Sequence, residues 1–127
     1  MPGATWIWTA ASIGLVVVLA VNYDKPGMIV AAFGVLLNLD ATLVNSGMPV
    51  AGLGRGTAAA VAASGGQYVL AGAHTVGGWL GDVLVLTIGQ ESLLLSVGDV
   101  LLMAAVGSVL VFAMTQPDEH GRAVAAE

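Results

Sequence analysis

Two short acidic triplets are the residues of this chain that most resemble catalytic groups. Gly81-Asp82-Val83 and Gly98-Asp99-Val100 repeat one sequence seventeen residues apart. Two carboxyl groups in different surroundings can act as general acid and general base, as in membrane peptidases of the aspartic type. Structural roles explain both acids as well, because Gly-Asp is common in turns and Asp99 suits a helix start. We favour those roles and keep a membrane hydrolase using Asp82 and Asp99 as an alternative.

A second polar group lies between residues 38 and 45. Asn38, Thr42 and Asn45 are spaced by four and three residues, so they share one helix face, with Asp40 roughly opposite. An acid inside an apolar stretch is costly to ionise unless it is paired or hydrated, and such acids often mark proton or cation paths. Simpler readings are a hydrogen bond between helices or a place close to the interface for Asp40, and helix packing or capping of the turn at 47–49 for the other three. A small transporter or proton-conducting element using Asp40 is therefore the second alternative.

Histidine and cysteine give little support for a metal or cofactor. His74 and His120 are the only histidines, and the chain has no cysteine. Two histidines so far apart make a poor zinc or haem site, and thiolate sites and disulfides are excluded. We predict that His74 joins a polar cluster with Tyr68 and Asp82. We assign no catalytic residue, no metal and no cofactor, and a protein that is not an enzyme is the favoured reading.

Three apolar stretches must position these residues. They cover about 5–21, 27–45 and 97–115, and Asp40 and Asp99 are the only charged residues within them. At a rise of about 1.5 Å per residue each can cross a hydrocarbon core about 30 Å thick. The chain is 57% hydrophobic and 9% charged, with a mean hydropathy of +0.93. These values predict three transmembrane helices surrounded by lipid.

The rest of the chain consists of a connection, 46–96, and a polar tail, 116–127. Alternating β-branched residues at 83–88 favour a short strand, which in lipid must pair, pack on the helices or lie in the interface. A short helix is expected near 57–63. The predicted fold is one membrane domain over 1–127, an all-α protein with three transmembrane helices and a small irregular or short β-containing cap between the second and third.

Charge and small residues suggest how the chain is placed and what it contacts. A net charge of −5 excludes nucleic-acid binding. With three crossings Lys25 and Arg122 lie on one side, which the positive-inside rule makes cytoplasmic, with the amino terminus outside. Arg55, in the longer connection, counts in the opposite direction with less weight. Small residues four apart permit close helix packing within the chain or with other subunits: Ala10 and Gly14, Gly27 and Ala31, Ala104 and Ser108. The favoured function is an accessory or structural subunit of a larger membrane assembly, with self-association as the other possibility.

One segment also carries a family resemblance. Residues 38–50 read NLDATLVNSGMPV, and Pro26-Gly27, 79–83 and 96–100 add further matching elements in order. Over about 15–112 the chain resembles a family of bacterial integral membrane proteins of unknown function. The resemblance implies the helical membrane architecture and no activity, substrate or cofactor. Family members have further helices before the first one here and an apolar residue at Asp40, so the chain resembles a shortened member in which any role of Asp40 is its own.

Overall fold

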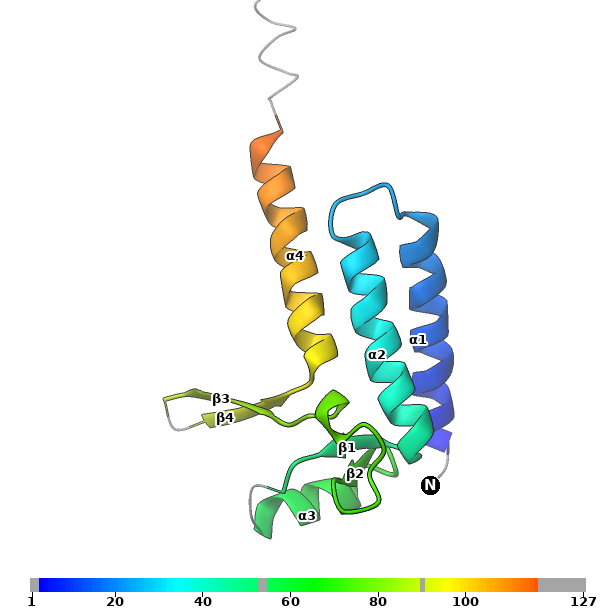
Figure 1. Cartoon of the computed structure of the whole chain (residues 1–127), viewed down its shortest axis with the longest axis vertical. Helices are drawn as coiled ribbons and strands as arrows, with labels where there is room; N and C mark the ends of the chain where they lie inside the picture. The colour runs from blue at the N-terminus through cyan, green and yellow to red at the C-terminus, as the bar shows by residue number, and fades with distance from the viewer. Residues whose placement is uncertain (1–2, 53–54, 90, 117–127) are drawn as a thin grey trace, which may run out of the picture.

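The computed structural model of the chain describes residues 3–52, 55–89 and 91–116. Three long helices stand side by side, and the remaining elements gather at one end of them (Figure 1). In chain order the elements are α1 (Gly3–Val21), α2 (Met28–Asn45), β1 (Met48–Val50), α3 (Arg55–Ala63), β2 (Tyr68–Leu70), the 3-10 helix η1 (Gly78–Leu80), β3 (Leu84–Ile88), β4 (Glu91–Leu95) and α4 (Val97–Thr115). The prediction of a mostly helical protein with a cap containing short strands is confirmed.

Two of the helices, α2 and α4, are long and apolar enough to cross a membrane. They match the predicted stretches 27–45 and 97–115 closely. The first predicted stretch, 5–21, forms the remaining long helix and counts as a shorter apolar helix over Thr5–Val21. Two candidate spans are thus found by length and composition, and the third crossing stays a prediction. The predicted tail 116–127 lies, from residue 117, outside the described residues.

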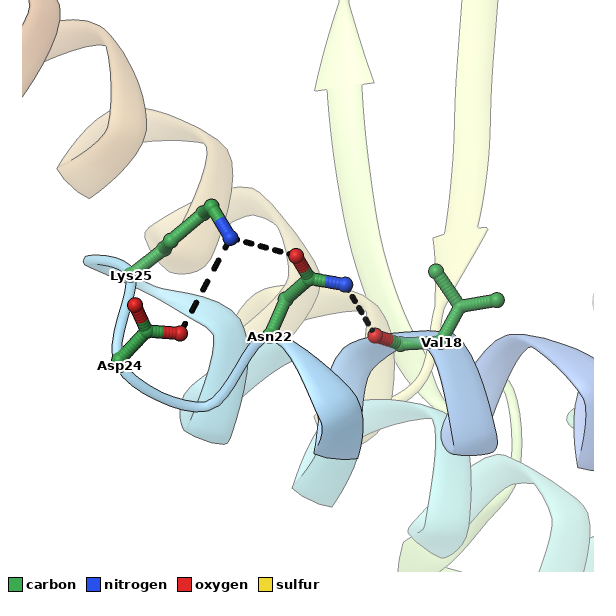
Figure 2. Close-up of polar contacts among 4 residues, drawn as sticks. All are labelled: Val18, Asn22, Asp24 and Lys25. Carbon is green, nitrogen blue, oxygen red and sulfur yellow. Dashed lines mark hydrogen bonds and ion pairs between the residues drawn. The ribbon is translucent and has the colours of Figure 1, made fainter.

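A polar turn joins α1 to α2 at the end of the helices away from the cap (Figure 1). Figure 2 shows how the turn is closed: Asn22 Nδ2 donates to the carbonyl of Val18 at 2.8 Å, and Lys25 Nζ donates to Asn22 Oδ1 at 2.5 Å. The Lys25 amine also lies 3.9 Å from Asp24 Oδ1. The side chain of Lys25 therefore caps the turn, and the lysine charge is balanced locally.

Helices α2 and α4 run antiparallel with their backbones in close contact. A Cβ on Gly34 would lie 2.7 Å from the carbonyl oxygen of Gly98, and one on Gly27 would lie 2.6 Å from that of Ala105. Gly27 also precedes α2 with a φ of 79°, a left-handed conformation that glycine adopts at little cost. Only hydrogen atoms fit between the two helices at these points, so glycine sets the spacing of the pair.

The cap is attached to the end of α2. Strand β1 follows α2 directly and pairs in parallel with β2, from Met48 opposite Tyr68 to Val50 opposite Leu70. On its other edge β1 meets the segment at Asp82, whose amide donates to the carbonyl of Pro49 at 2.7 Å. A small apolar core joins these parts to the helix and consists of Ala41, Met48 and Leu80. The cap is therefore packed against the end of α2.

Strands β3 and β4 form a hairpin that projects sideways from the lower end of α4 (Figure 1). The strands pair antiparallel, from Leu84 opposite Leu95 to Ile88 opposite Glu91. All five side chains of β3 are exposed. Of the arrangements that the sequence allowed for the β-branched run, the strand pairs with the neighbouring segment of its own chain.

The close contact between α2 and α4 predicts that alanine at position 98 destabilises the fold. The added Cβ would meet the side-chain oxygen of Asn38 and the carbonyl oxygen of Gly34. Overpacking of this kind costs about 1–3 kcal/mol. Thermal unfolding of the Gly98→Ala protein in mild detergent, followed by circular dichroism, should show a lower Tm. The matched control is Gly107→Ala in the same helix, where nothing lies within 4 Å of the added atom; an equal response of both variants would contradict the prediction.

Candidate functional site

A ring of hydrogen bonds joins α2 to the first turn of α4. Asn38 Nδ2 donates to Asp99 Oδ1 at 2.9 Å, and Ser96 Oγ donates to Asn38 Oδ1 at 2.7 Å. The Ser96 amide donates to Asp99 Oδ2, and the Asp99 amide donates to Ser96 Oγ, both at 2.9 Å. Ser96 is fully buried. We call Asn38, Ser96 and Asp99 the clamp.

The local sequence explains half of the clamp. Ser96 and Asp99 are three residues apart at a helix start, the spacing at which each side chain reaches the other's free amide. The negative charge of Asp99 also lies at the positive end of the helix dipole. Asn38 comes from a different helix and presents its amide oxygen and nitrogen to both. The clamp therefore holds α4 to α2 and occupies every oxygen of the Asp99 carboxylate.

The other members of the α2 polar stripe also make internal bonds. Thr42 Oγ1 donates to the carbonyl of Asn38 at 2.8 Å and contacts Met48 Sδ at 3.6 Å. Asn45 Nδ2 donates to the carbonyl of Val76 at 3.0 Å, and the Val76 amide donates back to Asn45 Oδ1 at 2.9 Å. The stripe thus binds α4, β1 and the loop before η1 in turn.

A small cavity of about 140 Å³ lies between the clamp and the cap. It is lined by Trp8, Asn38, Thr42, Met48, Gln67, Tyr68, Asp82 and Asp99. Asp82 and Asp99 therefore face one space, as an acid pair would require. Their surroundings differ, because the Asp99 oxygens accept bonds within the clamp, whereas no hydrogen bond to the Asp82 carboxyl occurs among the described residues.

Asp82 is the one group of this cavity with an altered affinity for protons near neutral pH. Burial, and secondly the charge of Asp99, raise the pKa of Asp82 from an ordinary value of 3.8 to about 6. Burial followed by the charges of the two acids also raises the pKa of Tyr68. The cavity can hold a proton on Asp82, while both oxygens of the Asp99 carboxylate accept hydrogen bonds in the clamp.

Asp82 also lines a larger groove, of about 720 Å³, that leads away from the helices. This groove shares Gln67 and Tyr68 with the small cavity and continues along α3 to Leu94 of β4. The Asp82 carboxyl thus lies between the interior of the protein and the space beneath the cap.

The remaining predicted residues lie elsewhere. Asp40 is exposed on α2, and no bond or ion pair of its side chain is found in the described part of the chain. His74 is exposed and lines a different hollow with Asn45 and Thr75, so it does not share the cavity of Asp82. His120 lies outside the described residues. No group of three or more possible metal ligands occurs among the residues described.

Sequence reasoning found part of this arrangement. Asp99 was expected to suit the start of the last helix, and the capping box that it forms with Ser96 confirms it. The bond from Asn38 to Asp99 and the approach of Gly34 to Gly98 were missed. Trp8 and Gln67 were missed as cavity residues as well. These residues come from separate elements, and no spacing along the chain signals that they meet.

A family model called DUF5317, a family of unknown function, matches residues 4–113. The chain belongs to the DUF5317 family. The match covers nearly all of the three long helices together with the cap and the clamp. The resemblance seen in residues 38–50 and the later triplets, to a group of unknown function, is therefore confirmed. No curated protein and no solved structure matches the chain, so the function of this DUF5317 protein is argued from its geometry.

The clamp predicts that Asn38→Leu loosens the start of α4. The change leaves the Ser96 hydroxyl and one Asp99 oxygen without their partner, and an unsatisfied buried group costs about 1–3 kcal/mol. Hydrogen exchange of the amides at 97–100 should then quicken by roughly tenfold or more, since about 1.4 kcal/mol corresponds to a factor of ten. Ser108→Ala is the control, because Ser108 bonds only to the carbonyl of Ala104 in its own helix. Unchanged exchange at 97–100 in the Asn38 variant would contradict the role of the clamp.

The raised pKa of Asp82 predicts a pH-dependent stability. The folded protein binds this proton more tightly than the unfolded chain, so Asp82 stabilises the fold at low pH and that contribution is lost as the pH rises from 3.8 to about 6. Asp82→Asn should remove this part of the pH dependence and make the protein relatively more stable at pH 7. Unfolding midpoints of both proteins across this window test the sign, with Asp24→Asn in the exposed turn as control. Parallel curves for wild type and Asp82→Asn would reject it.

Proposed function

We propose that this DUF5317 protein crosses the membrane three times, with α1, α2 and α4, and serves as a helix-packing subunit of a larger membrane assembly. The observation that carries the proposal is the exposure of α4. Gly98 and Ala105 are its only buried residues, while apolar side chains such as Leu110 and Met114 are exposed, the latter at 84%. A helix this apolar and this open is stable only in lipid or against another protein.

The third crossing is argued from α1. This helix lies beside α2, and its outward side chains are apolar, including Ile7, Val17 and Val21. Its length of 19 residues corresponds to about 28 Å at the helical rise. Because α1 and α2 are joined by a short turn, α1 must return through any membrane that α2 crosses.

The orientation follows from the ends of the helices. The turn with Lys25 and the carboxyl end of α4 lie at one end of the bundle, and the cap lies at the other (Figure 1). Basic residues favour the cytoplasmic side. We therefore place the turn and the tail in the cytoplasm, and the amino terminus and the cap on the outer face.

An exposed side of α4 offers a place for a partner helix. A groove of about 560 Å³ runs along it, lined by Ala104, Gly107, Ser108, Val111, Phe112 and Thr115. In lipid, helices associate where small residues let their backbones approach. Within the described chain α4 packs mainly on α2, so this groove is free to receive a helix of another subunit or of a second copy.

Bulky residues in the groove should separate the protein from its partner. We expect the protein, extracted from membranes in mild detergent, to elute well above its own mass of 12.7 kDa. Ala104→Leu and Gly107→Leu fill the groove and should shift the protein to a monomer. Val106→Leu adds bulk on the other exposed side of α4 and should leave the assembly intact. Light scattering gives the mass of the eluted complex, and mass spectrometry gives its composition. A monodisperse monomer of the wild-type protein would contradict the proposal.

A further inference from the structure

We infer that the β3–β4 hairpin is an amphipathic arm that lies in the membrane interface, with Leu84, Leu86, Ile88, Leu93 and Leu95 turned toward the acyl chains. The inference rests on the proposed crossing of α4 and adds a second, different contact with lipid. Four observations carry it: the direction of the arm, its two unequal faces, its two-stranded backbone and the aromatic residue beside its base.

The direction of the arm is set by its connection to α4. Strand β4 ends at Leu95, and Ser96 follows as the cap of α4 and as a buried member of the clamp. Ser96, which is hydrogen-bonded to both α2 and α4, is therefore the one residue between strand β4 and helix α4. The arm leaves this point sideways to the helix axes (Figure 1). If α4 crosses the bilayer, the arm lies along the membrane surface at the level where α4 enters.

The two faces of the arm differ in polarity. Side chains alternate along a strand, and residues directly opposite on paired strands share a face. Among the residues whose side chains the structure describes, one face holds Leu84, Leu86, Ile88, Leu93 and Leu95, which are all apolar. The other face holds Val85, Thr87 and Leu94, of which Thr87 is polar.

The cap shows which face turns toward the membrane. Leu94, on the second face, lines the groove beneath the cap together with Val50 and Val61. The second face is therefore turned toward the cap, which lies beyond the ends of the helices. The more apolar Leu86 face must then turn the opposite way, toward the layer that α4 crosses.

The backbone of the arm explains why the interface suits it better than the hydrocarbon core. Each of its strands has a single partner strand in the described chain, and the hydrocarbon core supplies no hydrogen bonds to the outer edge of a strand. Five residues per strand give a reach of about 17 Å. The boundary between headgroups and acyl chains offers apolar contact on one side and hydrogen bonding on the other.

An aromatic residue marks the same level. Trp79, in η1, is 65% exposed, and η1 packs against both α2 and α4. Its neighbour Leu80 is buried in the core beneath α2. An exposed tryptophan beside the end of a membrane helix is typical of the interface.

Spin labels test the arm directly, because a chain without cysteine accepts single cysteines cleanly. Four proteins carry a nitroxide at Leu86, Val85, Leu110 or Ala73, all exposed positions. They are reconstituted in vesicles of phosphatidylethanolamine and phosphatidylglycerol at a ratio of about 3:1. Accessibility to oxygen, which enters lipid, is compared with accessibility to a water-soluble nickel complex. The label at Leu110 in α4 tests whether that helix crosses the membrane, and the label at Ala73 in the cap is the reference for a site exposed to water.

We expect the ratio of oxygen to nickel accessibility to be high at Leu110, several-fold lower at Ala73, and at Leu86 closer to Leu110. Val85, on the opposite face of the same strand, should be more accessible to nickel than Leu86. If Leu110 is shielded but Leu86 is as wet as Ala73, the arm does not lie in lipid, and the crossing stands without it. Shielding of Leu86 from both reagents, with dipolar broadening between labels, would mean pairing with a second copy and would likewise overturn the inference. If Leu110 is wet, crossing and arm fail together.

Discussion

The clamp between Asn38, Ser96 and Asp99 is the interaction on which the arrangement of this protein depends. Lipid is as apolar as the helix surfaces, so the hydrophobic effect does not drive helices together inside a membrane. Close packing and hydrogen bonds must do so. Both occur at the same point, because Gly98 lies between Ser96 and Asp99 and brings α4 against Gly34 of α2. Since α4 packs on little else in the described chain, the clamp also fixes the direction of everything joined to it.

The position of the clamp along each helix sets the relation between the helix pair and the cap. It engages α4 in the first turn but α2 seven residues before its end, so Leu39–Asn45 extends past the start of α4. This extension carries Thr42 and Asn45, which bind β1 and the loop before η1. One polar face of α2 thus bonds to α4 through Asn38 and, further along the helix, to the cap through Thr42 and Asn45. Asp40 lies on this extension, beyond the residue of α2 that contacts the start of α4, and it is exposed there.

Apolar stretches and helix-capping residues predicted the helices well, because the ends of a helix depend on residues close by in the sequence. Gly27, the Ser46-Gly47 turn and the Ser96–Asp99 capping box each act within one turn of chain. Contacts between distant segments were not readable in this way. Asn38 and Asp99 are 61 residues apart, and the residues around either one do not indicate that the two side chains meet. Small-residue spacing also failed to discriminate, since Gly27 packs against Ala105 whereas nothing lies within 4 Å of a Cβ on Gly14.

The two Gly-Asp-Val triplets have the same sequence, but their aspartates play different roles because their surroundings in the fold differ. Both glycines permit a close approach, Gly98 to α2 and Gly81 to the carbonyl of Pro49. At position 99 the helix start and Asn38 supply donors, so that carboxylate becomes structural. At position 82 the amide and carbonyl are taken up beside β1 and the carboxyl is left facing the cavity. Burial without donors, next to a charge that the clamp keeps in place, raises the pKa of Asp82. Burial is thus the main reason that Asp82 binds its proton more tightly, and the neighbouring Asp99, held in the clamp, adds to the effect.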